Sequence, residues 1–151
     1  MSANMLRTKL KAARTSRPRA ITALSIFFVA GAVISFIAGM SLLRPNSFLE
    51  SIWRLNPHAH ENLSRLGLWA GLMLSTVSML CAAAAIGLWR GSRWGYWLAL
   101  GLILTNLLGN VINVALGTEP RAIVGIPIAA ALLAYLIFSK QVREFFSKSK
   151  N

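Results

Sequence analysis

The chain has 151 residues, of which 56% are hydrophobic and only 13% are charged, and its formal net charge is +12. This composition is too apolar, and carries too few charges, for a water-soluble globular domain of this length. It indicates a protein that is embedded in a membrane.

Four apolar runs account for this composition, and none of them contains a charged side chain. Each is about as long as the roughly 20 residues that an α-helix needs to cross the hydrocarbon layer. Runs of this length suit helices, whose backbone groups bond to one another, better than the short strands of a barrel. We predict an all-α integral membrane protein with four transmembrane helices in a compact bundle, over residues 20–43, 67–89, 95–116 and 122–138.

Residues 1–19 form a basic arm ahead of the first span. A basic arm, an apolar run and then Ala30-Gly31-Ala32 are also the pattern of a cleaved signal peptide. Because the apolar run continues without a break to Leu43, we expect an uncleaved span, with cleavage as the alternative. The arm itself is expected either to lie on the membrane surface as a helix or to remain a basic tail without structure.

The connection between the first two spans is the longest hydrophilic segment. Its sequence SFLE, residues 47–50, has the spacing of a capping box, and the side chains around it predict a short amphipathic helix at the membrane surface. Asn56 and Pro57 predict the start of a further helix, which we expect to continue into the second span. Glu61 and Arg65 are spaced to pair on that helix.

Two histidines in this connection raise the question of a metal site. His58 and His60 are two residues apart, so on a helix they point to different faces and do not share an ion. His58 with Glu61 has better spacing, but the sequence offers no third ligand. No span contains a histidine that would hold haem. We predict surface histidines, with no metal and no cofactor.

The second and third spans are joined by the sequence GLWRGSRWGYW, residues 87–97. Trp and Tyr favour the headgroup level of a membrane, and Gly91-Ser92 supplies the residues of a tight turn. Arg90 and Arg93 then lie at the tip of this hairpin. We interpret it as an interfacial turn, and the alternative is that the two arginines bind an anionic lipid headgroup.

The third span contains Asn106, Asn110 and Asn113, which fall on one face of a helix, with Asn106 near the middle of the bilayer. Hydroxyl groups at a similar depth in the second span are expected to bond to them, and these belong to Ser75, Thr76 and Ser78. We favour polar contacts that hold helices together, although such bonds contribute only about 0.6 kcal/mol each. The alternatives are a polar pocket for a lipid headgroup, a quinone or a similar ligand, and an interface to a partner protein.

Small residues recur every four positions in the first three spans, a pattern that permits close approach of helices and leaves one stripe for a partner. The tail, residues 139–151, is basic. Phe138, Val142, Phe145 and Phe146 share one helical face, so we expect the fourth helix to continue into the tail as an amphipathic extension.

Charge is distributed unevenly across the four spans. Twelve Lys and Arg lie on the side of the arm, the hairpin and the tail, and four lie on the other side. By the positive-inside rule both termini are cytoplasmic, which predicts a multi-pass protein of the bacterial inner (plasma) membrane. Because the basic residues flank membrane spans, we expect anionic lipid headgroups on the cytoplasmic side as partners, and not nucleic acid.

The spans contain no Asp, Glu, Lys, Arg or His, whereas proton-coupled transport usually needs such a group inside the bilayer. Cys81 is the single cysteine, so no thiol pair exists, and acids occur only outside the spans. We therefore predict a non-enzymatic accessory protein that interacts with lipid, with a partner membrane protein or with itself as a homo-oligomer. A transporter or channel-like module acting as an oligomer ranks second, and a membrane enzyme acting on lipid ranks third.

The order of four short spans, a basic arm, the GLWRG hairpin, an Asn-rich third span and KQVREFF after the fourth resembles small four-helix bacterial inner-membrane proteins of unknown function. The resemblance covers nearly the whole chain. It implies the architecture, and it brings no catalytic residue and no cofactor.

Overall fold

The computed structural model describes residues 18–44, 47–118 and 120–147, and this part of the chain is helical without a β-strand. Most of the basic arm predicted for residues 1–19 lies outside the described residues, as do the last four residues of the tail. The long helices are α2 (Arg19–Leu43), α4 (Leu68–Trp89), α5 (Arg93–Ala115) and α6 (Gly125–Phe138). The shorter α-helices are α3 (Pro57–Ser64) and α7 (Lys140–Ser147), and two 3-10 helices are η1 (Phe48–Leu55) and η2 (Pro120–Val124).

Three of these helices, α2, α4 and α5, are long and apolar enough to cross a membrane. The fourth apolar run, Ala122–Phe138, passes the same test only together with α7, from which it is bent by 57°. The chain therefore has three candidate spans, or four if the bent pair counts as one, as expected of a multi-pass membrane protein. The predicted continuation of the fourth helix into the tail is wrong, because the backbone is extended at Ser139 and the helix ends there.

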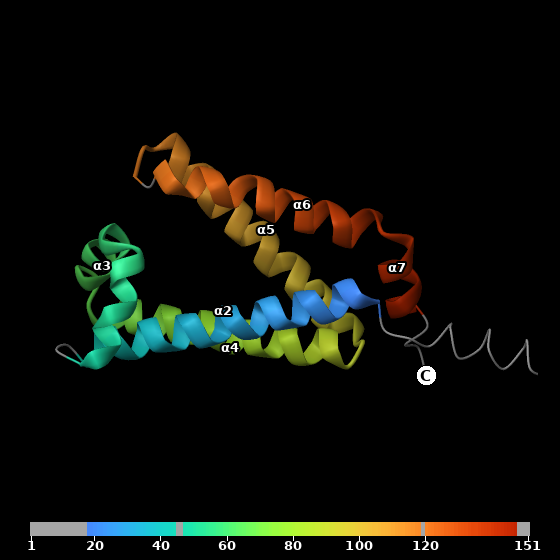
Figure 1. Cartoon of the computed structure of the whole chain (residues 1–151), viewed down its shortest axis with the longest axis horizontal. Helices are drawn as coiled ribbons and strands as arrows, with labels where there is room; N and C mark the ends of the chain where they lie inside the picture. The colour runs from blue at the N-terminus through green and yellow to red at the C-terminus, as the bar shows by residue number, and fades with distance from the viewer. Residues whose placement is uncertain (1–17, 45–46, 119, 148–151) are drawn as a thin grey trace, which may run out of the picture.

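Helices α2 and α4 lie side by side, antiparallel, along most of their length (Figure 1). Small residues permit this approach: a β-carbon placed on Gly39 would lie 3.3 Å from Cβ of Leu74, which is tighter than most such contacts, and 3.5 Å from the carbonyl oxygen of Gly71. The hydroxyl of Ser78 donates a 2.8 Å hydrogen bond to the carbonyl oxygen of Ala32 across the pair. The prediction that small-residue stripes bring helices close together is confirmed for α2 and α4.

The hairpin between α4 and α5 turns at Gly91, which has a φ of +69°. The backbone N–H of Ser92 donates to the carbonyl of Gly87 at 2.9 Å, and the Ser92 hydroxyl donates to the same oxygen. Just beyond the turn, α4 and α5 cross with Gly87 and Gly95 in backbone contact, and a β-carbon on either would overlap the other residue. The two helices therefore meet as closely as their backbones allow.

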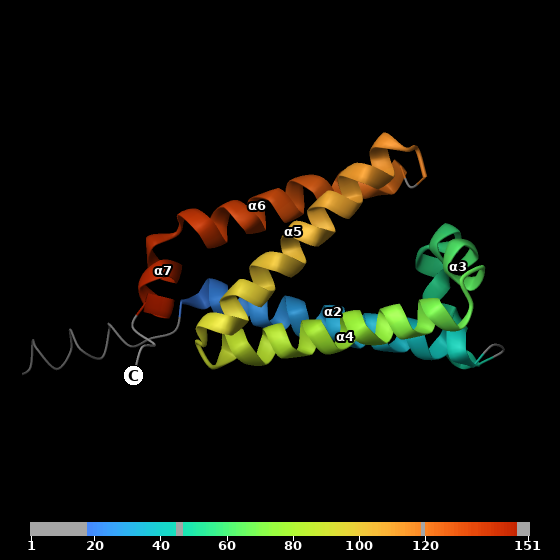
Figure 2. The same cartoon turned by 180° about the vertical axis from the view of Figure 1, so that it is seen from behind.

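From this crossing the four long helices form two antiparallel pairs, α2 with α4 and α5 with α6, which diverge toward their far ends (Figures 1 and 2). We call the end with the crossing the hairpin end and the other the open end. The buried core lies toward the hairpin end, where five helices contribute to it, with Ile21, Phe28, Leu88, Ile103, Leu136 and Val142 among its members. The predicted compact four-helix bundle is not confirmed: packing is tight at the hairpin end and within each pair, and the two pairs diverge from there.

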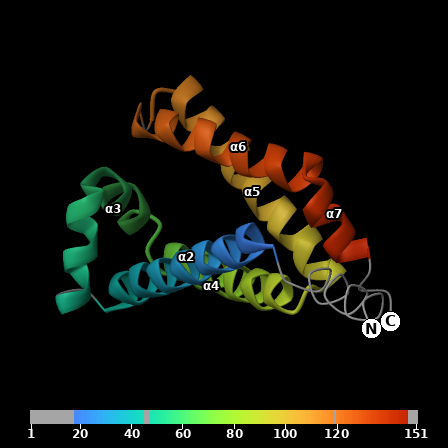
Figure 3. The ribbon, with the colours of Figure 1, turned by 45° about the vertical axis from the view of Figure 1, so that its right-hand side comes forward.

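Helix α7 folds back against the hairpin end of α5 (Figure 3). Val142 and Phe146 are buried there, and the Phe145 ring packs over Gly91. The guanidinium Nε of Arg93 donates a 3.2 Å hydrogen bond to the backbone carbonyl of Phe146. The apolar face of α7 and the Arg93 hydrogen bond therefore hold α7 against the hairpin.

At the open end, η1 differs from the predicted capping-box helix. The side chain of Ser47 makes no capping hydrogen bond, and its buried hydroxyl has no partner among the described residues. The segment forms a 3-10 helix. It is held against α2 by a 2.7 Å hydrogen bond, which the indole N–H of Trp53 donates to the Ser41 hydroxyl. A tertiary contact therefore replaces the predicted cap.

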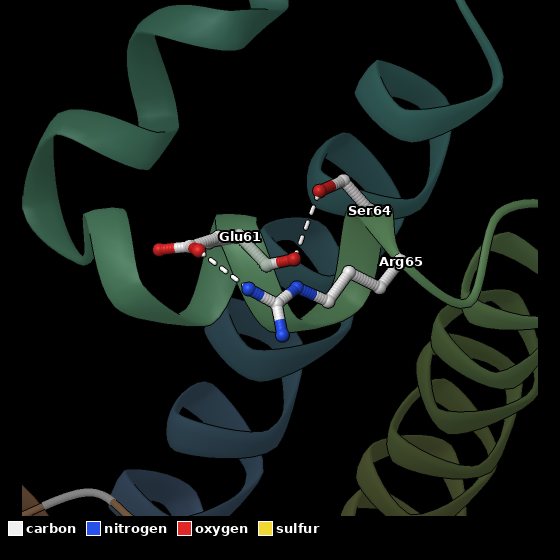
Figure 4. A network of polar contacts seen from close by, with 3 residues as sticks. All are labelled: Glu61, Ser64 and Arg65. Carbon is white, nitrogen blue, oxygen red and sulfur yellow. Dashed lines mark hydrogen bonds and ion pairs between the residues drawn. The ribbon is translucent and has the colours of Figure 1, made fainter.

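The next helix, α3, begins as predicted: Asn56 Oδ1 accepts a 3.1 Å hydrogen bond from the N–H of Ala59. Glu61 and Arg65 form the predicted ion pair at 2.8 Å on an exposed surface (Figure 4). The predicted continuation into the second span is wrong, because α3 ends at Ser64 and Gly67, with a φ of +54°, separates it from α4.

Candidate functional site

Two cavities lie along the region where the helix pairs diverge. The deep cavity has a volume of about 440 Å³ and is lined by all four long helices. The outer cavity, near the open end, has a volume of about 580 Å³ and is lined by α3, α5 and the start of the α6 region. Gly125 lines both cavities, so we describe them together as one groove. Both volumes fall within the range of about 300–1,000 Å³ that is usual for ligand sites.

The two cavities differ in polarity. The deep cavity is lined mainly by apolar side chains, such as Phe28, Ile128 and Leu132. The outer cavity presents carboxamides and one hydroxyl, from Asn56, Asn62, Asn110, Asn113 and Thr118. Among the described residues that line the groove, none carries a formal charge.

The three asparagines predicted on one face of the third span lie along this groove. Asn106 lines the deep cavity, whereas Asn110 and Asn113 line the outer one. The amide nitrogen of Asn110 donates a 3.0 Å hydrogen bond to Oδ1 of Asn106. The hydroxyl of Thr118 donates to Asn113 Oδ1 at 3.2 Å. These side chains therefore form two hydrogen-bonded polar pairs along the groove, from the open end toward the middle of α5.

Asn110 is seated against α6 at Gly125. A β-carbon on Gly125 would lie 2.5 Å from Nδ2 of Asn110, so only glycine leaves the carboxamide in its present place. Sequence reasoning did not identify Gly125 as part of the site, since glycine spacing alone does not reveal which helix it faces. It also missed Asn56 and Asn62, because they belong to the connection rather than to a span.

The hydroxyl groups of the second span do not bond to the asparagines. Ser78 donates to Ala32 on α2, and Thr76, which is exposed, donates to the carbonyl of Leu72 within α4. Ser75 lies on the α2-facing side of α4, with its backbone nitrogen near Gly39. Thr76 therefore bonds within α4, and Ser78 bonds to α2. The asparagines bond within α5 and to the turn that follows it.

The predicted anionic-lipid residues lie at the hairpin end, away from the groove. Arg90 and Arg93 are both exposed, and Arg93 also holds α7 through the Phe146 carbonyl. Lys140 and Arg143 of α7 are exposed as well. These cations lie on the two segments that meet at this end, the hairpin and α7.

The histidines take separate environments: His58 is exposed, and the ring of His60 stacks on Trp53 with centroids 5.0 Å apart. Among the described residues, no group of three or more His, Cys, Asp or Glu is placed to hold a metal ion. The groove itself presents neutral hydrogen-bonding groups in its outer cavity and mainly apolar side chains in its deep cavity.

No family model, no curated protein and no solved structure matches this chain.

Proposed function

We propose that this chain is a non-enzymatic, multi-pass protein of the bacterial inner membrane that holds a lipid in the groove between its two helix pairs. The observation that carries the proposal is the change of polarity along the groove, from carboxamides in the outer cavity to apolar side chains in the deep cavity. A membrane lipid has the same order of groups, a polar head joined to an apolar chain.

The exposure of the asparagines supports a ligand in preference to helix contacts alone. Asn106 and Asn113 belong to a span, yet both are exposed. Both accept a hydrogen bond at Oδ1, but amide N–H groups that are left without a partner still cost roughly 2–7 kcal/mol in an apolar environment. An occupant that brings hydrogen-bonding atoms to this face would remove that cost. Contacts between helices would not, since the hydrogen bonds of these side chains remain within α5 and the turn after it.

The orientation follows from the distribution of Lys and Arg, twelve on one side of the spans and four on the other. We place the hairpin end and both termini in the cytoplasm and the open end of the groove at the outer leaflet. The exposed cations at the hairpin end, Arg90, Arg93, Lys140 and Arg143, would then face anionic headgroups of the inner leaflet, each contributing about 1 kcal/mol of attraction.

A second candidate is a homo-oligomer that acts as a transporter or channel-like module. It is favoured by Gly101 and Gly109 of α5, where an added β-carbon would meet nothing within 4 Å. This unoccupied stripe of small residues would suit close approach of another helix. Native mass spectrometry of the chain and of a Gly101→Leu variant tests it, because a Leu on the stripe is expected to leave only monomers.

The proposed function is tested by native mass spectrometry of the protein released from its own membrane. We expect a bound lipid on the unmodified chain and its loss from Asn106→Leu, which removes a polar group from the groove. Thr76→Leu is the matched control, since Thr76 is an exposed polar residue of a span that does not line the groove. Equal lipid retention by both variants, or no lipid on the unmodified chain, would contradict the proposal.

A further inference from the structure

The groove also specifies what kind of lipid it holds. We infer that its occupant is a diacylglycerol, a glycerolipid without a phosphate, whose free hydroxyl bonds to the carboxamides of Asn106 and Asn110. This inference rests on the proposed function and adds the chemistry of the head group.

Depth is the first argument. Asn106 lies nine residues before the end of α5 at Ala115, which places it about 14 Å along the helix from the open end. In a bilayer this position is well inside the hydrocarbon, where a charged group is costly. The head group that reaches Asn106 is therefore uncharged, which excludes the phosphate of a phospholipid.

Charge around the groove agrees with this conclusion. None of the described lining residues is ionisable as an acid or a base apart from the Cys81 thiol. The nearby ions of α3, Glu61 and Arg65, neutralise each other in an exposed pair (Figure 4). This pair therefore presents no net charge that would attract an anionic head group.

The remaining hydrogen-bonding capacity of the asparagines selects a hydroxyl. Within the described chain, the Asn110-to-Asn106 bond leaves the Asn106 amide nitrogen and the Asn110 carbonyl oxygen without partners. The Asn106 nitrogen is a donor and the Asn110 oxygen is an acceptor, and the two residues lie on adjacent turns of α5. A hydroxyl group both accepts and donates, so its hydrogen-bonding chemistry matches that of both atoms. A quinone carbonyl only accepts, so it would leave the Asn110 oxygen unsatisfied.

The deep cavity accounts for the rest of the molecule. Beyond Asn106 it is walled by Phe28 of α2, Ile103 of α5 and Leu132 of α6, which suit an acyl chain. The cavity is partly open between the diverging pairs, so the second acyl chain would remain in the surrounding lipid. A lipid with one chain in the groove and one outside needs no closed binding chamber.

The experiment uses the full chain in phosphatidylcholine nanodiscs that contain, in separate preparations, diacylglycerol, phosphatidylglycerol or ubiquinone. The lipid that stays bound after transfer to detergent is measured by native mass spectrometry. We expect diacylglycerol to be retained about tenfold more than either competitor, because two neutral hydrogen bonds together account for about one order of magnitude in affinity. Asn106→Leu should abolish this preference, and Thr76→Leu should keep it.

A change in the ligand provides an independent control that does not depend on the folding of a variant. Diacylglycerol whose hydroxyl is methylated keeps both acyl chains and loses the donor, so its retention by the unmodified protein should fall to that of phosphatidylcholine. Preferential retention of phosphatidylglycerol, ubiquinone or the methylated lipid would overturn the inference and leave lipid binding intact. Failure to retain any lipid would overturn the proposed function itself.

Discussion

The amide nitrogen of Asn110 donates a 3.0 Å hydrogen bond to Oδ1 of Asn106, one turn away on α5. Because the two side chains line different cavities, this bond joins the polar part of the groove to its apolar part. Both carboxamides keep hydrogen-bonding capacity that the described chain does not use. We therefore expect changes around this pair to affect binding more than folding.

Gly125→Ala is expected to weaken lipid binding while leaving the stability of the fold nearly unchanged. The new methyl group would meet Nδ2 of Asn110, the end of a flexible side chain, so the carboxamide moves aside and its bond to Asn106 breaks. We expect the free energy of unfolding in detergent to change by about 1 kcal/mol or less, while lipid retention falls several-fold. Gly109→Ala is the control, because its methyl group would enter open space. Equal retention by the two variants would show that the position of Asn110 is unimportant.

Gly95→Ala is expected to destabilise the fold. Its β-carbon would overlap the backbone of Gly87 and Leu88, which is unable to move away as a side chain would. Overpacking of this kind typically costs about 1–3 kcal/mol. Chemical denaturation in detergent measures the loss, and Gly101→Ala, which has no neighbour within 4 Å of the added methyl, should show none. A Gly95→Ala protein as stable as the unmodified chain would refute the close crossing.

Arg93→Ala is expected to loosen α7. The variant loses the 3.2 Å hydrogen bond to the Phe146 carbonyl, which at a partly buried site contributes about 1 kcal/mol. Amide hydrogen exchange across residues 140–147 should then become roughly fivefold faster. Arg90→Ala removes the same charge from the same hairpin without touching α7, so its exchange rates should remain unchanged. Equal acceleration in both variants would assign the effect to charge.

The orientation is tested with two matched cysteines in a Cys81→Ala background. Ser51 and Ser147 are both exposed, and each donates its hydroxyl to a backbone carbonyl three residues earlier in its own helix. On intact cells, a membrane-impermeant maleimide should label Ser51→Cys and leave Ser147→Cys unlabelled until the cells are permeabilised. The reverse pattern would invert the proposed topology.

The helices that the sequence predicted best are those fixed by composition or by local spacing. The boundaries of α2 and α4 lie within one residue of the predicted runs, because the side chains change from apolar to polar at those points. The Asn56 cap and the Glu61–Arg65 pair are also confirmed, since both depend on residues three or four positions apart.

The sequence was less informative wherever a distant segment decides the outcome. At Ser139 the helix ends and α7 turns back against α5, a contact between distant segments that the spacing of the apolar residues did not predict. The asparagines were equally ambiguous, because a spacing of four residues permits a bond within one helix as readily as a bond between two. Which of these forms depends on how far α5 lies from α4, and periodicity contains no information about that distance.

The contact of Gly87 with Gly95 also has a mechanical consequence. From Gly95 to its end at Ala115, α5 extends about 30 Å beyond its backbone contact with α4. A rotation of about 5° about this contact would displace the far end by about 3 Å, which is comparable to one hydrogen-bond length. Helices adjust to bilayers of different thickness by changing their tilt. We therefore expect the width of the groove to vary with the thickness of the surrounding bilayer.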